Sequence, residues 1–290
     1  MQMVILAGGL GTRMRPLTDE LPKVLIPVNG KPFLHHQIEL LKEHGIRDIV
    51  LCVGHLGDLI RTRFGDGDWL GVRIRYSEER GTLLGTAGAV KNAEPSLEDD
   101  FFLLYGDAYL RVDYREVMRY FRRSGAQGLM VVYHNSNRLE RSNVVVRDGR
   151  VAVYNKDSRT PGMEHINYGL SVLRKEALRL VPPGRPFSQE ELYRLLIEQG
   201  ELLAWEAEHR FYEIGSRQGL AEFRELVASR EVEATTMTQH NAGLTVIGKT
   251  TQHLHVEPRD VGEAFRPPAG DLKVAPTSHV PFEAFPLVQR

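Results

Sequence analysis

The feature that most constrains the fold is a short apolar run near the start of the chain that leads directly into glycines. Residues 3–7 are continuously apolar, which is typical of a strand buried on both faces of a parallel sheet. Gly8, Gly9 and Gly11 follow, and glycines let a backbone bend sharply and come close to a ligand. Just past this turn, Thr12, Arg13, Arg15 and Lys23 add hydroxyl and cationic donors suited to phosphate oxygens. The sequence therefore predicts a site for a polyanion.

Two common phosphate-binding loops do not fit this segment. The dinucleotide fingerprint G-x-G-x-x-G/A would cover residues 9–14, but Met14 stands where a small residue is needed for a helix to pack on a strand. A P-loop needs a lysine directly after its second glycine, whereas Gly11 is followed by Thr12.

Strand and helix patterns alternate from residue 33 to residue 133. This alternation predicts βαβ units, and so an α/β fold with a mostly parallel sheet and helices on both faces. The pattern then changes, because an Asp-Gly turn at residues 148–149 lies between two apolar runs. We expect an antiparallel hairpin over residues 144–154, folded as an insertion beside the main sheet. Residues 202–207 are expected to form a strand at a sheet edge.

An apolar strand over residues 101–105 ends in Gly106 and Asp107. In open α/β sheets, ligands bind beyond the carboxyl ends of the strands. A carboxylate at that point can hold a metal ion, so Asp107 is the strongest single candidate for a site residue.

The combined pattern resembles the sugar-1-phosphate nucleotidyltransferase family. The signature of that family is G-G-x-G-T-R followed by P-L-T, P-K and P-V-x-G-K-P, and this chain has every part, in order, within residues 8–32. Residues 84–88 resemble the base-binding loop of mannose- and heptose-1-phosphate guanylyltransferases more than the Q-rich loop of thymidylyltransferases. The resemblance covers about residues 3–228 and implies a Rossmann-like nucleotidyltransferase domain over residues 1–230, with a small antiparallel sugar-binding insertion.

The resemblance also implies roles for individual residues. Those implied to be catalytic are Arg13, Lys23 and Asp107. Those implied to bind the nucleotide are Leu6, Gly8, Gly9, Gly11, Thr12, Gly85, Thr86 and Gly88. Those implied to bind the sugar phosphate are Asn155, Lys156, Asn167 and Gly169. The implied Mg²⁺ ligands are Asp107 and Glu213. Asn155 stands where the family commonly has Glu, and Glu213 stands where it commonly has Asp.

The implied reaction joins a nucleoside triphosphate, with GTP favoured, to a sugar 1-phosphate and releases pyrophosphate. The attacking phosphate oxygen is already ionised, which explains why no Ser-His or Cys-His arrangement is evident. Three alternatives stay open: a non-catalytic nucleotide-sugar-binding regulatory protein, a uridylyl-, thymidylyl- or cytidylyltransferase of the same family, and a guanylyltransferase for a pterin cofactor. The last shares the opening A-G-G but lacks the P-L-T and P-K continuation.

Composition limits the other partners. The net charge of −1 gives no overall basic field, so no nucleic acid is expected. No apolar run reaches membrane-spanning length, so we expect no membrane association and a cytoplasmic location; a homo-oligomer is left open. Cys52, the only cysteine, lies in an apolar run and is expected to be a buried structural thiol.

The C-terminal tail, residues 231–290, differs from the rest of the chain. It holds six of the fifteen prolines, and its apolar stretches are short, so we expect it to be irregular or accessory. Residues 243–250 fit the P-loop pattern letter for letter, but no apolar strand precedes them, and the pattern is rejected on that ground.

Overall fold

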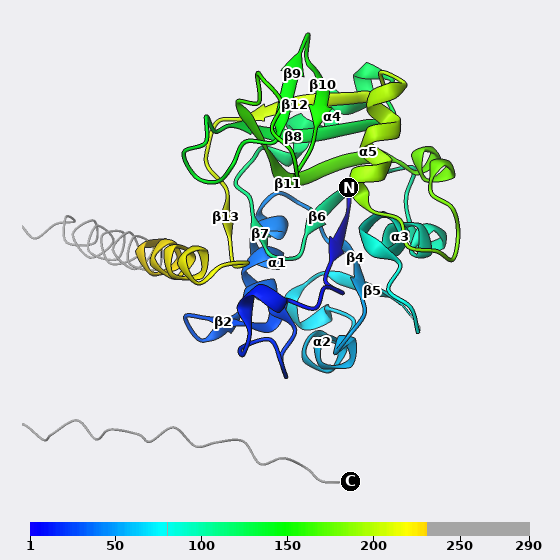
Figure 1. Cartoon of the computed structure of the whole chain (residues 1–290). Coiled ribbons are helices and arrows are strands. Elements are labelled where there is room, and N and C mark those ends of the chain that lie inside the picture. Colours follow the sequence, from blue (N-terminus) through cyan, green and yellow to red (C-terminus); the bar gives the residue numbers. More distant parts are fainter. Residues whose placement is uncertain (80, 231–290) are drawn as a thin grey trace, which may run out of the picture. The chain divides into compact units, whose positions relative to one another are not determined.

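The computed structural model describes residues 1–79 and 81–230, and the predicted tail, including residues 243–250, lies outside them. The described residues form a nine-stranded sheet in the order β5-β4-β1-β6-β11-β8-β12-β10-β9, flanked by helices (Figure 1). Its strands are β1 (Gln2–Leu6), β4 (Asp48–Val53), β5 (Arg73–Glu78), β6 (Asp100–Tyr105), β8 (Gly128–His134), β9 (Val144–Arg147), β10 (Arg150–Tyr154), β11 (His165–Arg174) and β12 (Leu202–Ala207).

The first half of the sheet is parallel, as predicted. β1 pairs in parallel with β4 and with β6, and the register sets Leu6 beside Cys52 on one neighbour and Tyr105 on the other. The carboxyl ends of these three strands therefore meet at one edge. Met3, Val4 and Ile5 have no exposed surface, because β1 is covered on both faces.

The second half corrects the expectation of a mostly parallel sheet. β11 runs antiparallel to both β6 and β8, while β12 is parallel to β8. The sheet is therefore mixed. β12 also pairs with β10, so it is an interior strand and not the predicted edge strand.

The hairpin β9–β10 forms where it was expected. Asp148 and Gly149 both have positive φ, 48° and 71°, the conformation of a tight two-residue hairpin turn. β9 also pairs with β11, and β10 with β12, so the hairpin extends the main sheet instead of folding beside it. Figure 1 shows it at the opposite end of the molecule from β5.

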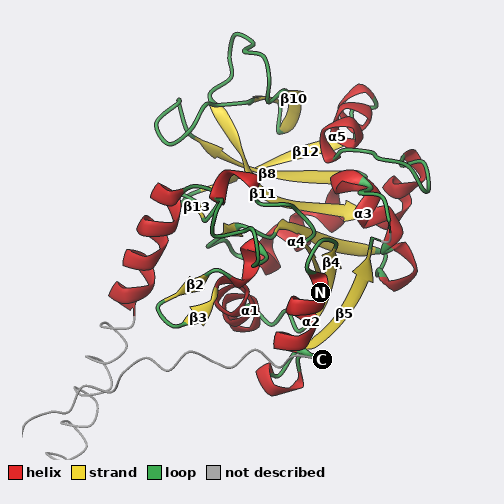
Figure 2. Ribbon diagram, turned by 60° about the horizontal axis from the view of Figure 1, so that its bottom comes forward, coloured by secondary structure: helices red, strands yellow, loops and turns green. Residues whose placement is uncertain are grey.

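Helices cover both faces of the sheet (Figure 2). One apolar core contains residues of α1 (Phe33–Glu43), α2 (Gly57–Phe64) and α4 (Tyr114–Ser124). The second core contains residues of α3 (Gly85–Asn92) and α5 (Gln189–Glu198). Met3 and Ile5 belong to the first core and Val4 to the second, because successive side chains of a strand point to opposite faces. A capping box at Ser188 begins α5.

Shorter elements connect these layers to the glycine loop. They are the 3-10 turns η1 (Thr12–Met14), η2 (Lys23–Leu25), η3 (Asp68–Leu70), η4 (Glu94–Ser96) and η5 (Lys175–Leu180) and the strand pairs β2 (Pro27–Val28) with β3 (Lys31–Pro32) and β7 (Ala108–Tyr109) with β13 (Tyr212–Glu213).

A third core joins Met14, Phe33 and Phe223. Phe223 belongs to a helix that covers the last described residues, 217–230, drawn in yellow at the left of Figure 1. The structure shows no helix long and apolar enough to cross a membrane among its described residues.

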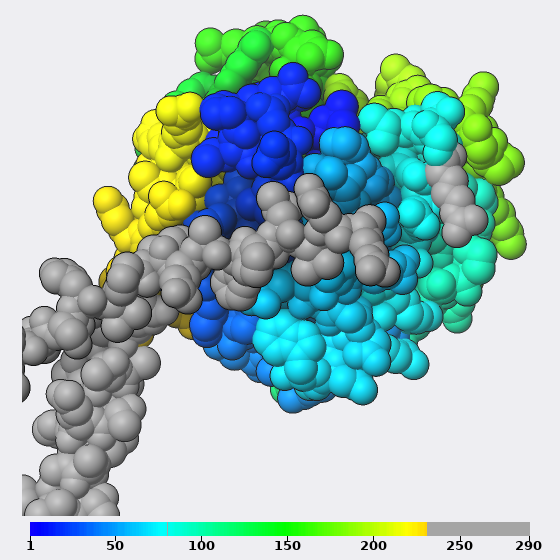
Figure 3. Space-filling model, turned by 90° about the horizontal axis from the view of Figure 1, so that it is seen from below, coloured from blue at the N-terminus to red at the C-terminus, as the bar shows by residue number. Residues whose placement is uncertain are grey.

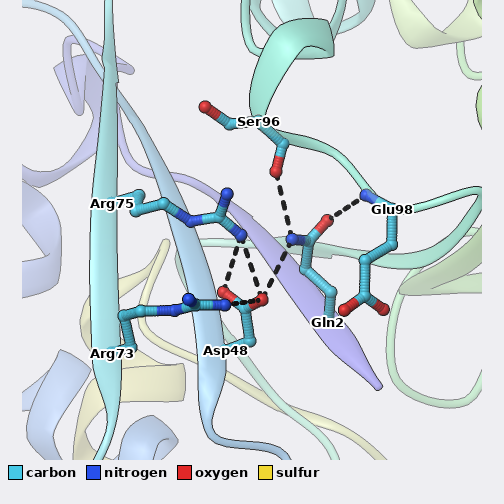
Figure 4. A network of polar contacts seen from close by, with 6 residues as sticks. All are labelled: Gln2, Asp48, Arg73, Arg75, Ser96 and Glu98. Atoms are coloured by element: carbon cyan, nitrogen blue, oxygen red, sulfur yellow. Dashed lines mark hydrogen bonds and ion pairs between the residues drawn. The ribbon is translucent and has the colours of Figure 1, made fainter.

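A polar network connects the amino ends of the parallel strands (Figure 4). Asp48, at the start of β4, accepts hydrogen bonds of 2.8 Å from Arg73 and Arg75 on β5, and one of 3.3 Å from Gln2 on β1. Gln2 in turn accepts from the backbone N–H of Glu98 at 2.9 Å. Burial alone would raise the pKa of Asp48, but the two arginines hold it below its usual value. This network secures the strands at the end of the sheet opposite the glycine loop.

Candidate functional site

Three cavities follow one another along the carboxyl ends of β1 and β6. We name them the end cavity (140 Å³), the middle cavity (150 Å³) and the large cavity (440 Å³). Leu6, Gly9 and Thr86 line both the end and the middle cavity. Tyr105 and Asp107 line both the middle and the large cavity. The three cavities therefore form one trough.

The glycine loop lines the middle cavity with backbone donors. In the described part of the chain, the backbone N–H groups of residues 8–11 donate no hydrogen bond. Gly11 has φ 61°, and its carbonyl accepts a 2.8 Å hydrogen bond from the buried Thr18 hydroxyl. That bond holds the loop in a left-handed conformation that favours glycine. Several N–H groups are thus free to bind an anion.

Gly106 brings the end of β6 against the end of β1. Its N–H donates to the Leu6 carbonyl at 3.0 Å, and a Cβ at this position would lie only 2.3 Å from that oxygen. A glycine is therefore required for close backbone approach. The next residue, Asp107, reaches the trough, where its Oδ2 lies 2.9 Å from Nζ of Lys23. The two side chains are only 27% and 16% exposed, so this ion pair is partly shielded from water.

Glu213 approaches Asp107 through the short strands β7 and β13. Ala108 pairs with Glu213, and the Ile214 N–H donates to the Asp107 carbonyl at 3.0 Å. A Cβ on Gly215 would lie 2.5 Å from Oε2 of Glu213 and 3.1 Å from both Oδ2 of Asp107 and Nη2 of Arg13. Two carboxylates and one guanidinium therefore converge on a single point at the junction of the middle and large cavities.

The large cavity contains three of the four residues predicted to bind sugar phosphate. Lys156, Asn167 and Gly169 line it together with Arg13, Asp107 and Glu213. The Lys156 ammonium lies 5.5 Å from the centre of the Tyr105 ring, within range of a cation–π contact. Gly169 has φ 93°, and its N–H donates to Oδ1 of Asn167 at 2.9 Å. This turn fixes the direction of the Asn167 side chain.

Three predicted residues are not brought to the walls of the trough. Asn155 uses its Oδ1 to accept hydrogen bonds of 2.8 Å from two backbone N–H groups in the turn that follows it. The Gly88 N–H donates to the Phe187 carbonyl at 3.0 Å, and a Cβ there would lie 2.9 Å from Cβ of Leu84, so Gly88 serves packing. Thr12 is exposed, although its chain neighbours Gly11 and Arg13 line the trough.

Other residues line the trough although the sequence analysis did not select them. Glu79 lines the end cavity, and Tyr105, Glu140 and Asn143 line the large one. Tyr105 directly precedes Gly106 and Asp107, which was a signal for its position. Partial desolvation, together with the charges of Glu213 and Asp107, raises the pKa of Glu140. No sequence pattern singles out Glu140, because it lies in a loop before the hairpin.

The carboxylate oxygens at the junction of the middle and large cavities suit a magnesium ion that binds together with a nucleotide. Within the described ranges, no group of three or more His, Cys, Asp or Glu side chains could hold a metal ion. Asp107 and Glu213 nevertheless place carboxylate oxygens near one point. Magnesium is commonly held by one or two carboxylates together with substrate phosphates and water, and these two residues supply that part of a coordination shell.

Comparison with known proteins gives the same family for the chain. A family model described as nucleotidyl transferase matches residues 2–155, more than half of the chain. A UTP–glucose-1-phosphate uridylyltransferase from Synechocystis is 32% identical over 220 residues, which cover 69% of this chain and 56% of that protein. A D-glycero-α-D-manno-heptose 1-phosphate guanylyltransferase from Campylobacter jejuni is 39% identical over 113 residues, 39% of this chain and 50% of that protein. The chain thus spans about half the length of these two curated relatives.

The solved structures agree with the sequence comparison. The structure of HddC from Yersinia pseudotuberculosis complexed with GMP-PN superposes with a TM-score of 0.65 at 26% identity, over 78% of this chain and 99% of that one. The fold, the glycine loop and the family match are thus consistent, and the chain belongs to the nucleotidyl transferase family.

Proposed function

We propose that this chain is a sugar-1-phosphate nucleotidyltransferase, which converts a nucleoside triphosphate and a sugar 1-phosphate into a nucleoside diphosphate sugar and pyrophosphate. The observation that carries the proposal is the trough, which is lined by free backbone donors, two lysines and two arginines together with Asp107 and Glu213. The relatives named above support the same reaction class. A cytoplasmic location, where nucleoside triphosphates are plentiful, is part of this proposal.

The triphosphate would lie on the glycine loop in the middle cavity. The N–H groups of residues 8–11 would donate to phosphate oxygens, and Arg13 would bind the phosphates at the junction with two parallel bonds. Lys23 would neutralise charge near the reacting phosphorus. It is held there by Asp107, its 2.9 Å partner. Preorganised donors of this kind are often the largest contribution to catalysis.

Asp107 and Glu213 would hold Mg²⁺. The ion would supply charge neutralisation at the phosphates and help to orient them. Pairing of β7 with β13 sets their backbones side by side. Lys23 donates a hydrogen bond to the Asp107 carboxylate, and the Gly215 N–H and the Ser216 hydroxyl donate to the Glu213 carboxylate.

Lys156 would bind the phosphate of the sugar 1-phosphate in the large cavity. One oxygen of that phosphate would attack the α-phosphorus of the nucleotide, forming a new O–P bond while the bond from the α-phosphorus to the bridging oxygen breaks. The electron pair leaves with pyrophosphate. The nucleophile is already ionised, so no general base is needed, and alignment of two bound substrates can contribute about 7–11 kcal/mol.

GTP is the proposed nucleotide. The guanylyltransferase from Campylobacter jejuni and the GMP-PN complex of HddC support this choice, together with the glycine loop at residues 84–88. UTP is the second candidate, because a uridylyltransferase is 32% identical over 69% of this chain.

A grid of nucleoside triphosphates against sugar 1-phosphates, scored by pyrophosphate release, tests the proposal. We expect magnesium-dependent release that requires both substrates and is fastest with GTP. Faster turnover with UTP, CTP or dTTP would show that GTP is not the preferred nucleotide. No release from any pair would overturn the proposed activity and favour a nucleotide-sugar-binding protein without catalysis.

A further inference from the structure

The two lysines of the trough differ in what holds them. Lys23 is paired with Asp107 at 2.9 Å, and of the two it is the only one paired with a carboxylate of the described chain. The Lys156 ammonium instead lies 5.5 Å from the centre of the Tyr105 ring and 5.9 Å from that of the Tyr154 ring. Both distances are within the range of about 6 Å over which an aromatic ring attracts a cation. Figure 3 shows the N-terminal segment, in dark blue, against the green segment that includes the hairpin β9–β10.

Tyr154 is held in place from two sides. Only 8% of it is exposed, and its ring packs edge to face against that of the buried Tyr193 on α5, with centroids 5.7 Å apart. Its hydroxyl accepts a hydrogen bond from Nδ2 of Asn167 at 3.3 Å. These contacts hold the Tyr154 ring at the wall of the large cavity.

Tyr105 is held beside it, and Gly169 leaves room for its ring. A Cβ at Gly169 would lie 3.3 Å from Cδ2 of Tyr105. Burial raises the pKa of Tyr105 well above its usual value, and the neighbouring Tyr154 adds to the rise. Tyr105 therefore stays protonated at neutral pH, and it offers Lys156 an aromatic ring without a neutralising charge.

We propose that Tyr105 and Tyr154 form an aromatic seat that positions Lys156, so that its full charge is available to the phosphate of the sugar 1-phosphate. We name these two rings the tyrosine seat. The inference deepens the proposed function and rests on it for the identity of that phosphate. Tyr154 acts through Lys156, so it is a positioning residue.

A seat of this kind suits a lysine that has to bind an anion. A carboxylate partner would neutralise the ammonium, and an incoming phosphate would compete with that partner. An aromatic ring attracts the cation through its negative face and leaves the three N–H donors of the ammonium for phosphate oxygens. Lysine is also a flexible side chain, and a side chain that is ordered beforehand loses less conformational entropy when the ligand binds.

NMR on a chain with ¹³C-labelled lysine tests the seat without turnover. The ε-methylene signal of Lys156 is identified by its absence in Lys156→Gln, and the two rings should shift its protons upfield of the other lysine signals. Titration with inorganic phosphate then gives a dissociation constant at this side chain.

Two substitutions of Tyr154 separate its ring from its hydroxyl. In Tyr154→Leu we expect a smaller upfield shift of the Lys156 signal and a dissociation constant for phosphate that is about three- to tenfold higher, the size expected for ordering one flexible side chain. Tyr154→Phe keeps the ring, so both quantities should stay close to those of the wild type.

Tyr76 provides a matched control, because its ring also lies beside a cation but does not line the trough. The Arg61 guanidinium carbon is 4.3 Å from the centre of this ring, and the Tyr76 hydroxyl donates to the Gly65 carbonyl at 2.7 Å. Tyr76→Leu therefore removes a similar ring and hydroxyl, and it should leave phosphate binding unchanged.

Steady-state kinetics show through which residue Tyr154 acts. Tyr154→Leu should raise the KM for the sugar 1-phosphate about three- to tenfold, with little change in kcat or in the KM for the nucleoside triphosphate. In the Lys156→Gln background the same substitution should have no further effect, because the effects of residues that act through one contact do not add.

The outcomes are distinct. Weaker phosphate binding in Tyr154→Leu, with recovery in Tyr154→Phe, supports the inference even if the chain releases no pyrophosphate and the proposed reaction is overturned. Unchanged phosphate binding in Tyr154→Leu, or an equal rise in KM in the Lys156→Gln background, overturns it. A wild-type Lys156 signal that shows no upfield shift or does not respond to phosphate also overturns it, and this measurement needs no folded variant of Tyr154.

Discussion

Gly215→Ala is predicted to disable the site while leaving the fold intact. Gly215 lies at the point where Glu213, Asp107 and Arg13 converge, and a Cβ there would be 2.5 Å from Oε2 of Glu213 and 3.1 Å from the other two groups. Its φ is not positive, so the backbone accepts alanine. The new methyl group therefore acts through the side chains around it.

The size of the effect follows from these contacts. Ordinary van der Waals contact begins at 3.4 Å, so the Glu213 carboxylate has to move by roughly 1 Å, and a displacement of that size can lower a rate about 100-fold. In free energy this is about 2.7 kcal/mol of transition-state stabilisation. The carboxylate is the end of a flexible side chain, but the movement weakens its hydrogen bonds from the Gly215 N–H and the Ser216 hydroxyl, so we expect a loss of about 1–3 kcal/mol of stability with the fold retained.

The assay is pyrophosphate release at saturating substrates, combined with thermal unfolding. Gly128→Ala is the matched control, since a Cβ at Gly128 would lie 3.0 Å from Leu196 and 3.1 Å from Leu202, in the core and away from the trough. Added volume in a packed core costs typically about 1–3 kcal/mol of stability, so Gly128→Ala should change the unfolding temperature without changing kcat. Wild-type kcat in Gly215→Ala would refute the convergence of these three groups as the reacting centre.

Three further predictions test other parts of the structure. Asp107→Asn should lower kcat by about 10²–10³-fold, as loss of one electrostatic contact commonly does, with little change in unfolding temperature; near-normal magnesium-dependent turnover would remove Asp107 from the site. Burial alone would raise the pKa of Asp48 in the folded chain, but Arg75 and Arg73 outweigh burial and lower it. The ionised Asp48 carboxylate therefore contributes to the free energy of unfolding above about pH 4, and this contribution is lost as the pH falls through the lowered folded pKa. Denaturant unfolding from pH 6 to pH 3 should therefore show a steeper loss in the wild type than in Asp48→Asn, and equal slopes would contradict this. Burial raises the pKa of Cys52 to about 12, so intact mass should show no alkylation of the native chain at pH 8 and one alkyl group after denaturation; full labelling of the native chain would show that the thiol is accessible.

The elements that could be predicted from the sequence depend on local patterns. The apolar run of β1 and the glycines after it identified the strand and the loop, because both signals lie within a dozen residues. Strand direction is not a local property. The sequence of β11 is compatible with either direction, and its antiparallel pairing with β6 and β8 follows from packing of the whole sheet.

Local patterns also identified part of the site, whereas contacts between distant segments could not be predicted. Asp107 and Glu213 were both selected from short motifs, and the structure brings them together through β7 and β13. Asn155 was assigned to the sugar phosphate because it stands beside Lys156 where the family commonly has Glu, but its amide oxygen accepts hydrogen bonds from the local turn. Glu79 was missed because its carboxylate lies beside Gly8 and Gly54, which follow β1 and β4, and no spacing along the chain records that contact.

Isotope tracing tests most directly whether the sugar phosphate attacks the α-phosphorus of the nucleotide. The chain is incubated with Mg²⁺, GTP and a sugar 1-phosphate whose phosphate oxygens carry ¹⁸O, and the products are identified by mass. Attack of the sugar phosphate on the α-phosphorus predicts a GDP-sugar that retains all of the label, an equal amount of unlabelled pyrophosphate, and no reaction when either substrate is omitted. Labelled orthophosphate, labelled pyrophosphate or GTP consumption without the sugar phosphate would contradict it.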